Sequence, residues 1–517
     1  MSSAAATVAE RRGASPRRDW SCRQREEPLM SSVDSSSPEA VSFQGQGVPA
    51  VTQTPQGPVV PQCASPLAPA QAPAASAPLA PAPGPTLTSA GAPGKAPYPP
   101  APTLPTLSGP KGSGIRFDFN EGCRVMLPKG DWKVWLSDSH TGNILFHTSM
   151  EEGRVISAKK YFVPFEIEIS KNGKTVMRYR YDARDKDVLI MFPVGTLGDL
   201  VGWFPYAVKF QEKHQCRLTV SMSPLLIPLF KDAYPHIEFL TPEQVKVERY
   251  YATYRIGLFF DDHECAYQPS DFRHVGLHRT AGHILGVDPT EMPPLLSLPD
   301  DTRPIQEKYV CIAVQASTQC KYWNYPGGWK EIVQFLKEAG YRVICIDQKS
   351  THGVGTTWNH IPWGCEDATG DRPLTERARW LRHADFFVGL SSGLAWLAWA
   401  TGTPVVMISG FTHESNEFAT PYRIINHHTC NSCWNDVRHR FDHFDFMWCP
   451  RHKGTARQFE CTGLITPTYV KNVIRSIPTF VERGRLHPTS VMQRESAEKN
   501  AHPAPYHRKE EDTAEAV

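Results

Sequence analysis

Four cysteines near the C-terminal end of the chain have the spacing of a metal-binding site. They follow the pattern C-x2-C-x15-C-x11-C and are Cys430, Cys433, Cys449 and Cys461. Thiolates spaced in this way can bring four sulfur atoms to one tetrahedral point, which suits zinc or a single iron ion. A disulfide pair or four unrelated thiols are the alternatives, and the spacing favours the metal. Four sulfurs complete a closed, structural site, so nearby histidines such as His452 are not expected to be ligands.

A first polar loop could carry a general base. Residues 195–199 (GTLGD) link the apolar run 188–192 to a helical stretch. The two glycines allow the backbone to turn sharply and to approach a ligand closely. Asp199 falls at or near the helix N-terminus, where it could cap the helix or deprotonate an acceptor hydroxyl. The residues alone leave both roles open.

A second polar loop, residues 315–323 (QASTQCKYW), follows another buried strand. Its hydroxyls, amide and lysine suit a ligand that carries phosphate. Lys321 could neutralise a departing diphosphate, and the other interpretation is a solvated loop lysine. The polar character of the whole loop favours a role in binding.

A third loop, residues 389–396 (GLSSGLAW), runs from a strand into a helix that opens near Ser392. Backbone N–H groups and the helix dipole would point at an anion there. The loop is neither a Walker A sequence nor G-x-G-x-x-G. As the third polar loop at a strand end, it indicates a nucleotide-diphosphate site.

The elements that must position these loops begin after a low-complexity stretch, residues 1–110. Sixteen of the 51 residues from Pro55 to Pro105 are proline, and Tyr98 is the only aromatic residue among them. Such a segment cannot bury enough apolar area to offset its ordering entropy, so we predict a disordered tail. The N-terminus has no apolar run after its arginines and is not expected to be a secretory signal.

Residues 111–185 are predicted to form a small antiparallel β domain. Apolar and polar residues alternate over 115–119, 132–136 and 165–169, and Asn172-Gly173 suits a type I′ hairpin turn. The second faces of these strands carry several aromatic residues. They indicate either packing on another domain or subunit or an ordinary core.

Two series of alternating strands and helices follow, in residues 186–300 and 301–485, and a proline-rich stretch separates them. This pattern predicts an α/β fold of two Rossmann-like, doubly wound domains. Ligands bind at the carboxyl ends of parallel strands, where all three polar loops are expected. The cysteine finger occupies residues 427–463 of the second domain, and residues 486–517 form a polar tail.

Bulk composition excludes some classes of protein. The formal net charge of +2 gives no reason to expect nucleic acid or another polyanion as a partner. No run reaches the roughly 18 apolar residues of a membrane span. Thirteen cysteines without a secretory signal fit a reducing compartment, so we expect a cytoplasmic protein.

Together the three loops resemble those of glycosyltransferases of the B architecture that use ADP-heptose. The stretches QASTQCKYWNYPGGW (315–329) and GLSSGLAWLAWA (389–400) are most similar to the bacterial autotransporter heptosyltransferases. That family also has an N-terminal β domain and a four-cysteine finger. The resemblance extends from about residue 112 to about residue 480.

The resemblance implies the chemistry. The donor would be ADP-D-glycero-β-D-manno-heptose and the acceptors serine hydroxyls of an autotransporter adhesin passenger. The finger would hold one structural iron per protomer, with zinc as the other possibility. The chain would assemble into a dodecameric ring, to which the β domain contributes.

The resemblance also implies roles for individual residues. Asp199 would accept the proton of the acceptor serine, and Lys321 would stabilise the departing ADP, with inversion at the anomeric carbon. The remaining residues expected to contact donor or substrate are Thr196, Leu197, Gly198, Gln315, Thr318, Asp347, Ser391, Ser392, Gly393 and Leu394.

Two other functions fit parts of the sequence. A lipopolysaccharide core heptosyltransferase would use the same donor with a lipid acceptor, but it would need no cysteine finger. A scaffold that binds adhesins without catalysis would not need Asp199 and Lys321. Hydrolysis of ADP-heptose that depends on Asp199 would separate an enzyme from a scaffold.

Overall fold

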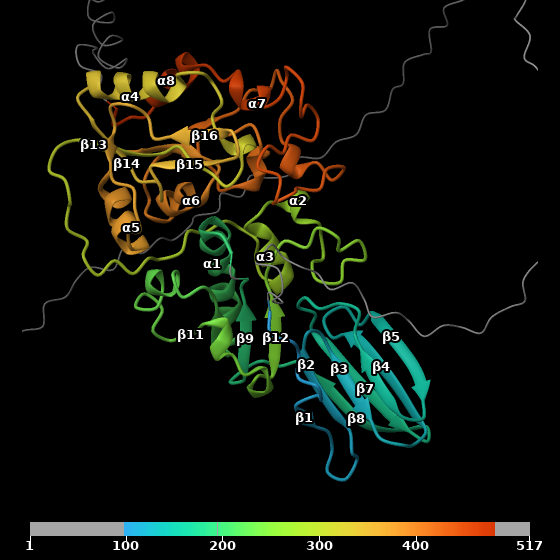
Figure 1. The fold of residues 1–517 in the computed structure, drawn as a ribbon. Helices are drawn as coiled ribbons and strands as arrows, with labels where there is room; N and C mark the ends of the chain where they lie inside the picture. The colour runs from blue at the N-terminus through green and yellow to red at the C-terminus, as the bar shows by residue number, and fades with distance from the viewer. Residues whose placement is uncertain (1–97, 194, 481–517) are drawn as a thin grey trace, which may run out of the picture. The chain divides into compact units, whose positions relative to one another are not determined.

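The computed structural model describes residues 98–193 and 195–480. Within them the predicted fold class is confirmed: two α/β domains, each on a largely parallel sheet, accompany an antiparallel β unit (Figure 1). The predicted tail 486–517 and residues 1–97 of the predicted N-terminal tail lie outside the described residues. No helix of the described residues is long and apolar enough to cross a membrane.

The first α/β domain contains an eight-stranded sheet in the order β11-β10-β9-β12-β2-β3-β6, with β1 paired to β2. Strands β11, β10, β9, β12 and β2 run parallel to one another, whereas β3 and β6 continue the sheet antiparallel. The strands are β1 Leu107–Ser108, β2 Arg116–Asn120, β3 Arg124–Leu127, β6 Gly153–Ile156, β9 Asp187–Met191, β10 Arg217–Ser221, β11 Glu238–Leu240 and β12 Ala252–Arg255.

Part of the segment predicted as a β domain shares a sheet with the first α/β domain. Strand β2 pairs in parallel with β12 and thereby joins β3 and β6 to the parallel sheet. The alternation of β2 predicted one solvated face, yet Asp118 is fully buried and forms an ion pair with Arg124 at 2.6 Å. Because a partnered charge can be buried, the polar residue did not mark an exposed face.

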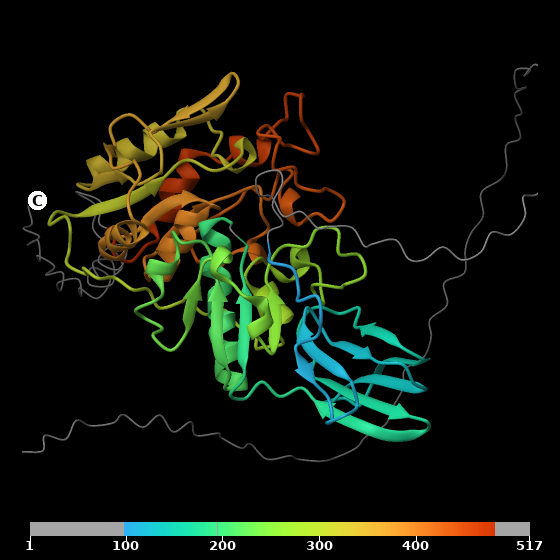
Figure 2. The ribbon, with the colours of Figure 1, turned by 60° about the horizontal axis from the view of Figure 1, so that its bottom comes forward.

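A separate four-stranded antiparallel sheet has the order β5-β4-β7-β8. Its strands are β4 Trp132–Asp138, β5 Ile144–Met150, β7 Phe165–Lys171 and β8 Lys174–Arg180. The hairpin turn between β7 and β8 is as predicted, with φ of 50° at Asn172 and 78° at Gly173. This sheet packs beside β2, where Phe117 lies 4.6 Å from Tyr179 between ring centroids (Figures 1 and 2). Tyr179, one of the aromatic residues of the second faces, thus packs on the neighbouring sheet of the same chain.

The second α/β domain has an all-parallel sheet in the order β17-β14-β13-β18-β19-β20 and a separate hairpin of β15 and β16. The strands are β13 Tyr309–Ala313, β14 Arg342–Cys345, β15 Thr351–Val354, β16 Thr357–His360, β17 Glu366–Asp367, β18 Phe387–Leu390, β19 Val405–Ile408 and β20 Arg423–Ile424. The α-helices of the described residues are α1 Leu197–His214, α2 Phe272–Val275, α3 Arg279–Leu285, α4 Gly328–Glu338, α5 Leu374–His383, α6 Gly393–Ala400, α7 Glu460–Gly463 and α8 Pro467–Arg475.

Strand β13 shows why its sequence is apolar without alternation. Val310 and Ile312 belong to the core under α4 and α8, whereas Cys311 and Ala313 belong to the core under α5 and α6. Helices therefore cover both faces of this sheet (Figure 1). A strand buried on both faces places no polar side chain along its length, and function is left to the loops at its end.

Two local predictions are wrong. Residues 98–110 were predicted to lie in the tail, but Tyr98 is 8% exposed and donates to the carbonyl of Ile256 at 2.7 Å. It covers the face of β9 that carries Leu189 and Met191. The sequence pattern also predicts a helix over about 225–233, but the structure forms only the short 3₁₀ turn Ile227–Leu229 there.

Candidate functional site

The first loop places Asp199 in the opening turn of α1. Thr196, not Asp199, is the N-cap residue, so the structure separates the carboxylate from the capping position. The Thr196 hydroxyl does not cap the helix but donates to Asp199 Oδ2. A carboxylate in the first turn faces the positive end of the helix dipole. Asp199 is half-buried and keeps its second oxygen for another partner.

Two glycines let the starts of α1 and α6 meet. A Cβ added at Gly198 would lie 2.6 Å from Trp396 Cδ1, and one added at Gly393 would lie 2.8 Å from Leu197 Cβ and 3.2 Å from the Gly198 nitrogen. Any larger residue would force the two helices apart. The first and third predicted loops therefore come together, and each of the two helices begins with N–H groups that have no partner within the helix.

Lys321 lies in the second loop, at the end of the 3₁₀ turn Gln319–Lys321. Its ammonium sits over the rings of Phe411, Trp434 and Phe441, between 5.2 and 5.8 Å from their centroids. Among the described residues it has no carboxylate within ion-pair distance. A cation held by aromatic faces and not neutralised by an acid is available to an incoming anion.

The charge of Lys321 also acts on Asp199. Burial raises the pKa of Asp199, while the hydrogen bond from Thr196 and the positive charge of Lys321 partly oppose that rise. The structure thus brings the predicted base and the predicted phosphate ligand into one electrostatic environment. A carboxylate with a raised pKa is a stronger proton acceptor than an ordinary aspartate.

The other predicted residues of the second loop lie beside Lys321. Gln315 has a buried Nε2 for which the described residues provide no hydrogen-bond partner. Thr318 is 2% exposed and contacts the Cys320 sulfur at 3.3 Å. An unpaired buried donor costs free energy unless a ligand accepts its hydrogen. Gln315 is consequently poised to bind a ligand oxygen.

Asp347, which was expected to contact the donor, makes hydrogen bonds to the backbone of the chain itself. It is 3% exposed, and its carboxylate accepts from the backbone N–H groups of Val314 at 2.7 Å and of Gln315 at 3.3 Å. Burial raises its pKa to about 6. In this arrangement Asp347 fixes the end of β13 and the start of the second loop.

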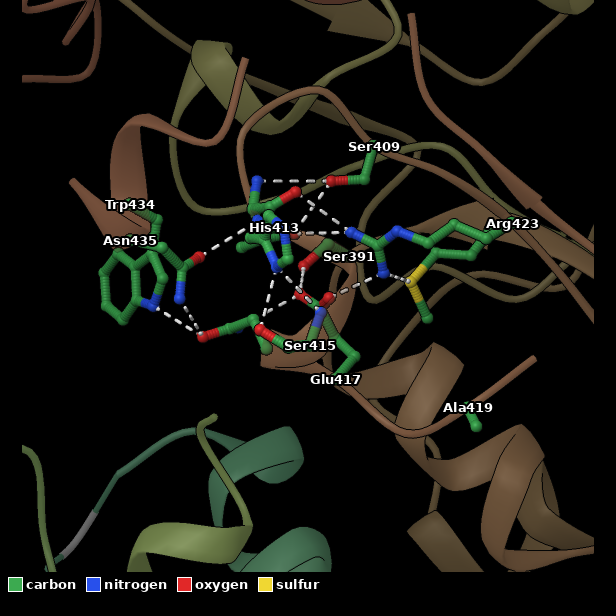
Figure 3. A network of polar contacts seen from close by, with 12 residues as sticks. Ser391, Ser409, His413, Ser415, Glu417, Ala419, Arg423, Trp434 and Asn435 are labelled. Atoms are coloured by element: carbon green, nitrogen blue, oxygen red, sulfur yellow. Dashed lines mark hydrogen bonds and ion pairs between the residues drawn. The ribbon is translucent and has the colours of Figure 1, made fainter. Parts of the chain in front are cut away.

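A buried carboxylate that is paired with an arginine holds the third loop in place. The Ser391 hydroxyl donates to the carboxylate of Glu417, which also forms an ion pair with Arg423 at 2.7 Å (Figure 3). Ser392 is the N-cap of α6 but makes no side-chain cap bond, and Leu394 is half-buried in the first turn. Glu417 and Arg423 were not predicted, because nothing in their local sequence distinguishes them from surface charges.

The cysteine finger lies against the second loop. Gln319 N–H donates to the carbonyl of Phe446 at 2.8 Å, and Asn324 Nδ2 donates to the Thr462 hydroxyl at 2.9 Å. Trp434, inside the finger, forms part of the aromatic surface under Lys321. The finger therefore packs against the loop that contains Lys321.

All four predicted ligand cysteines are free thiols in this structure. Cys433, Cys449 and Cys461 are buried and Cys430 is half-buried. Burial and then Glu460 raise the pKa of Cys430 to about 12, with smaller contributions from Cys433 and Cys449, whereas burial and the other cysteines raise the pKa of Cys461 well above its usual value. Thiols that oppose one another's ionisation in this way suit a bound cation, which would relieve the repulsion.

One set of ligand atoms in the described residues already lies within 4.8 Å of one another, and it differs from the predicted set. It combines Cys430 with His452 and Glu460. His452 was not expected to be a ligand, so the region supports metal binding but offers two overlapping sets of donors. Both sets share Cys430.

Comparisons with known proteins define the class first. The family model "Glycosyltransferase family 9 (heptosyltransferase)" matches residues 285–440, and "Glycosyltransferase TibC, N-terminal domain" matches residues 109–173. The chain is therefore a glycosyltransferase with the B architecture, in which two α/β domains carry the three loops.

Close relatives define the family. The chain is 53% identical to the autotransporter heptosyltransferase BAHTCr of Citrobacter rodentium over 77% of its own length and 94% of the relative. It is also 53% identical to BimC of Burkholderia thailandensis, an inactive autotransporter heptosyltransferase, over 74% of this chain and 89% of BimC. The protein belongs to the autotransporter heptosyltransferase family.

Solved structures agree. The iron-containing dodecameric glycosyltransferase TibC of enterotoxigenic E. coli superposes with a TM-score of 0.71 at 52% identity, covering 73% of this chain and 98% of TibC. A second structure, with the same identity, coverage and score, shows TibC in complex with ADP-D-beta-D-heptose.

Proposed function

We propose that this protein transfers heptose from ADP-D-glycero-β-D-manno-heptose to serine hydroxyls of an autotransporter adhesin in the cytoplasm. The observation that carries the proposal is the convergence of Asp199, Lys321 and the start of α6 at one place. This arrangement supplies a base, a cation and free N–H groups, which are the parts needed to move a sugar from a diphosphate to a hydroxyl.

The proposed reaction is a single displacement. Asp199 takes the serine proton as the serine oxygen attacks the anomeric carbon, and the bond from that carbon to the diphosphate oxygen breaks. Lys321 and the N–H groups at the start of α6 stabilise the negative charge that develops on ADP. One base and one attack give inversion at the anomeric carbon. Thr196, Leu197 and Gly198 line the heptose side, and Gln315 and Thr318 bond to the donor.

The test is the intact mass of an adhesin passenger fragment after incubation with the full chain and ADP-heptose. Heptose-sized mass increments are expected with the parent protein and with the control Glu212→Gln, which removes an exposed acid from the same helix α1. Asp199→Asn should give at most a trace of them in the same time while still binding the donor. Increments with Asp199→Asn equal to those of the parent would remove Asp199 from the role of base.

A second function, that of a scaffold without catalysis, has one observation in its favour: BimC is as similar to this chain as BAHTCr and is an inactive member. Asp199 lies close enough to Lys321 for the lysine's charge to act on its pKa, and this placement favours the enzyme. Release of ADP from ADP-heptose by the parent but not by Asp199→Asn would establish catalysis. The alternative function with a lipid acceptor has less support than the scaffold, because the relatives with 53% identity are autotransporter heptosyltransferases.

For the metal, we propose one structural iron per protomer held by Cys430, Cys433, Cys449 and Cys461, with zinc as the other ion that such donors accept. The bound ion would fix the finger against the second loop and supply no chemistry to the reaction. Elemental analysis of the purified protein should give one iron per chain. Cys449→Ser should lose it, whereas His452→Ala and the distant Cys265→Ser should keep it. Loss in His452→Ala with retention in Cys449→Ser would assign the mixed set instead.

We also propose a dodecameric assembly. Strand β5 lies at the edge of its sheet and exposes Ile144 by 62%, Leu145 by 46% and Phe146 by 47%. An exposed apolar edge strand is a surface that soluble proteins normally cover. Light scattering should give a mass near twelve protomers for the parent and a smaller particle for Phe146→Glu. An unchanged mass for that variant would exclude this edge from the interface.

A further inference from the structure

A buried polar network lies behind the third loop and ends on Ser391 (Figure 3). The Ser391 hydroxyl and the amide of Asn416 both donate to Glu417 Oε1, and Arg423 Nη1 donates to Glu417 Oε2 at 2.7 Å. Glu417 is 2% exposed, and the side chain of Arg423 is 9% exposed. The carboxylate is therefore a buried group with partners on both oxygens.

Glu417 is ionised in this network. Burial by itself would raise its pKa, but the charge of Arg423 and the hydrogen bonds from Ser391 and Thr412 outweigh burial and lower the pKa. An ionised carboxylate only accepts hydrogen bonds. The single hydroxyl hydrogen of Ser391 is consequently committed to Glu417.

This commitment limits what Ser391 can do toward a ligand. Its oxygen keeps lone pairs that can accept, but it has no hydrogen left to donate. The oxygens of a diphosphate diester carry no hydrogen at neutral pH, so Ser391 cannot bond to them. A sugar hydroxyl can donate to it. The same loop contacts Leu197 and Gly198 through Gly393, which places it on the side of Asp199 where the heptose would react.

We propose that Glu417 is a positioning residue that makes Ser391 an obligate hydrogen-bond acceptor for a hydroxyl of the donor's heptose. The inference rests on the proposed function, because it takes ADP-heptose as the donor. The third loop then has two separate tasks. Ser391 recognises the sugar, and the backbone N–H groups at the start of α6 are left for the diphosphate.

The test compares the affinities of the full, metal-containing chain for ADP-heptose and for ADP by titration calorimetry. Ser391→Ala leaves Glu417 paired with Arg423 and should weaken binding of ADP-heptose by about 3- to 10-fold, the effect of one hydrogen bond. Its affinity for ADP should change by less than about 2-fold, because ADP has no heptose hydroxyl that could lose a bond to Ser391. Ser391→Thr keeps a hydroxyl and should restore much of the preference for ADP-heptose.

Ser409→Ala is the matched control. Ser409 is also a buried serine of this network, since its hydroxyl lies 2.9 Å from that of Thr412, but it is not part of the third loop. Both affinities should stay as in the parent. A loss that is selective for ADP-heptose in Ser409→Ala would overturn the inference, because it would show a general effect of the network.

Glu417→Gln provides the second variant. Its carboxamide can donate to Ser391 and so free the hydroxyl hydrogen, which should lower the ratio of ADP-heptose affinity to ADP affinity. The double variant that combines Glu417→Gln with Ser391→Ala should lower this ratio of affinities by no more than Ser391→Ala alone does. Both substitutions act through the same hydroxyl, so their effects should not add. If Glu417→Gln does not fold, the two Ser391 variants decide the matter.

Equal losses for ADP and ADP-heptose in Ser391→Ala would overturn the inference, because ADP carries ribose and phosphates but no heptose. Unchanged affinity for both ligands would overturn it as well. Failure of the parent itself to bind ADP-heptose would instead overturn the proposed function. The two failures are therefore distinguishable.

Discussion

The starts of helices α1 and α6 use the same local scaffold and place their carboxylates oppositely. Each follows a buried strand, each contains glycine at the point of closest approach, and each begins with a hydroxyl residue as N-cap. At α1 the carboxylate, Asp199, is on the helix itself. At α6 the carboxylate, Glu417, lies behind the loop and is paired with Arg423.

The pKa values of the two carboxylates shift in opposite directions accordingly. Asp199 has no cationic hydrogen-bond partner among the described residues, and burial raises its pKa. For Glu417 burial is outweighed by Arg423, and the pKa is lowered. An acid that must take up a proton needs the first environment, whereas an acid that must hold a neighbour in place needs the second. The comparison assigns chemistry to α1 and positioning to α6.

The largest effect is expected from removing the charge on the α1 side. Asp199→Asn should lower the transfer rate by about 10²- to 10⁴-fold, the usual contribution of a general base. Because the folded state raises the pKa of this acid, its ionised form opposes folding at neutral pH. The melting temperature of the variant should therefore not fall. Rates by mass spectrometry and melting by calorimetry check both parts, and a rate within threefold of the parent would contradict the assignment.

The second-largest effect is expected from replacing Lys321. Lys321→Met removes the cation over the three aromatic rings and should lower kcat by about 10²-fold, as for the loss of one group that stabilises developing charge. Lys330→Met, an exposed lysine of α4, should leave the initial rate unchanged. A fall in affinity for ADP-heptose without any change in kcat would show that Lys321 binds the donor but does not assist its departure.

The close approach of the two helices can be tested by adding single methyl groups. Gly198→Ala and Gly393→Ala would each create a contact shorter than 3 Å and should cost about 1–3 kcal/mol of unfolding free energy, with loss of activity. Gly195→Ala, in the same loop, meets nothing closer than 3.7 Å and is the control. Urea unfolding measures all three. Equal stability of Gly198→Ala and Gly195→Ala would mean that α1 and α6 do not pack this closely in solution.

The smallest effect is expected from Thr196. Its hydrogen bond to Asp199 lowers the pKa of that carboxyl, so Thr196→Val should raise the pKa further. A base works only when deprotonated, and the acidic limb of the pH–rate profile should therefore move to higher pH. The rate at the plateau should fall by less than about tenfold, the value of one hydrogen bond. A shift to lower pH would contradict the assigned direction of the bond.

Much of this architecture followed from local sequence. The sequence pattern predicts helices over 279–285, 374–383 and 393–400 and a strand over 405–408, and the structure forms α3, α5, α6 and β19 there. Each has a strong apolar period or a clear stop signal, such as the Gly402 and Pro404 that follow α6. Failures occurred where long-range contacts decided the outcome. Tyr98 is ordered because a strand face far along the chain needs cover, and no local signal shows that.

The candidate site likewise has some features that local sequence predicts and others that long-range contacts decide. The sequence by itself determined that Asp199, Lys321 and Ser391 belong to loops that follow buried strands, and that the four cysteines have the spacing of a metal finger. Only the tertiary structure decided how each is used. It moved the N-cap role to Thr196, turned Asp347 toward the backbone and brought Glu417 behind Ser391. Protonation and hydrogen-bond direction depend on burial and on partners that are distant in the chain, and a linear pattern contains neither.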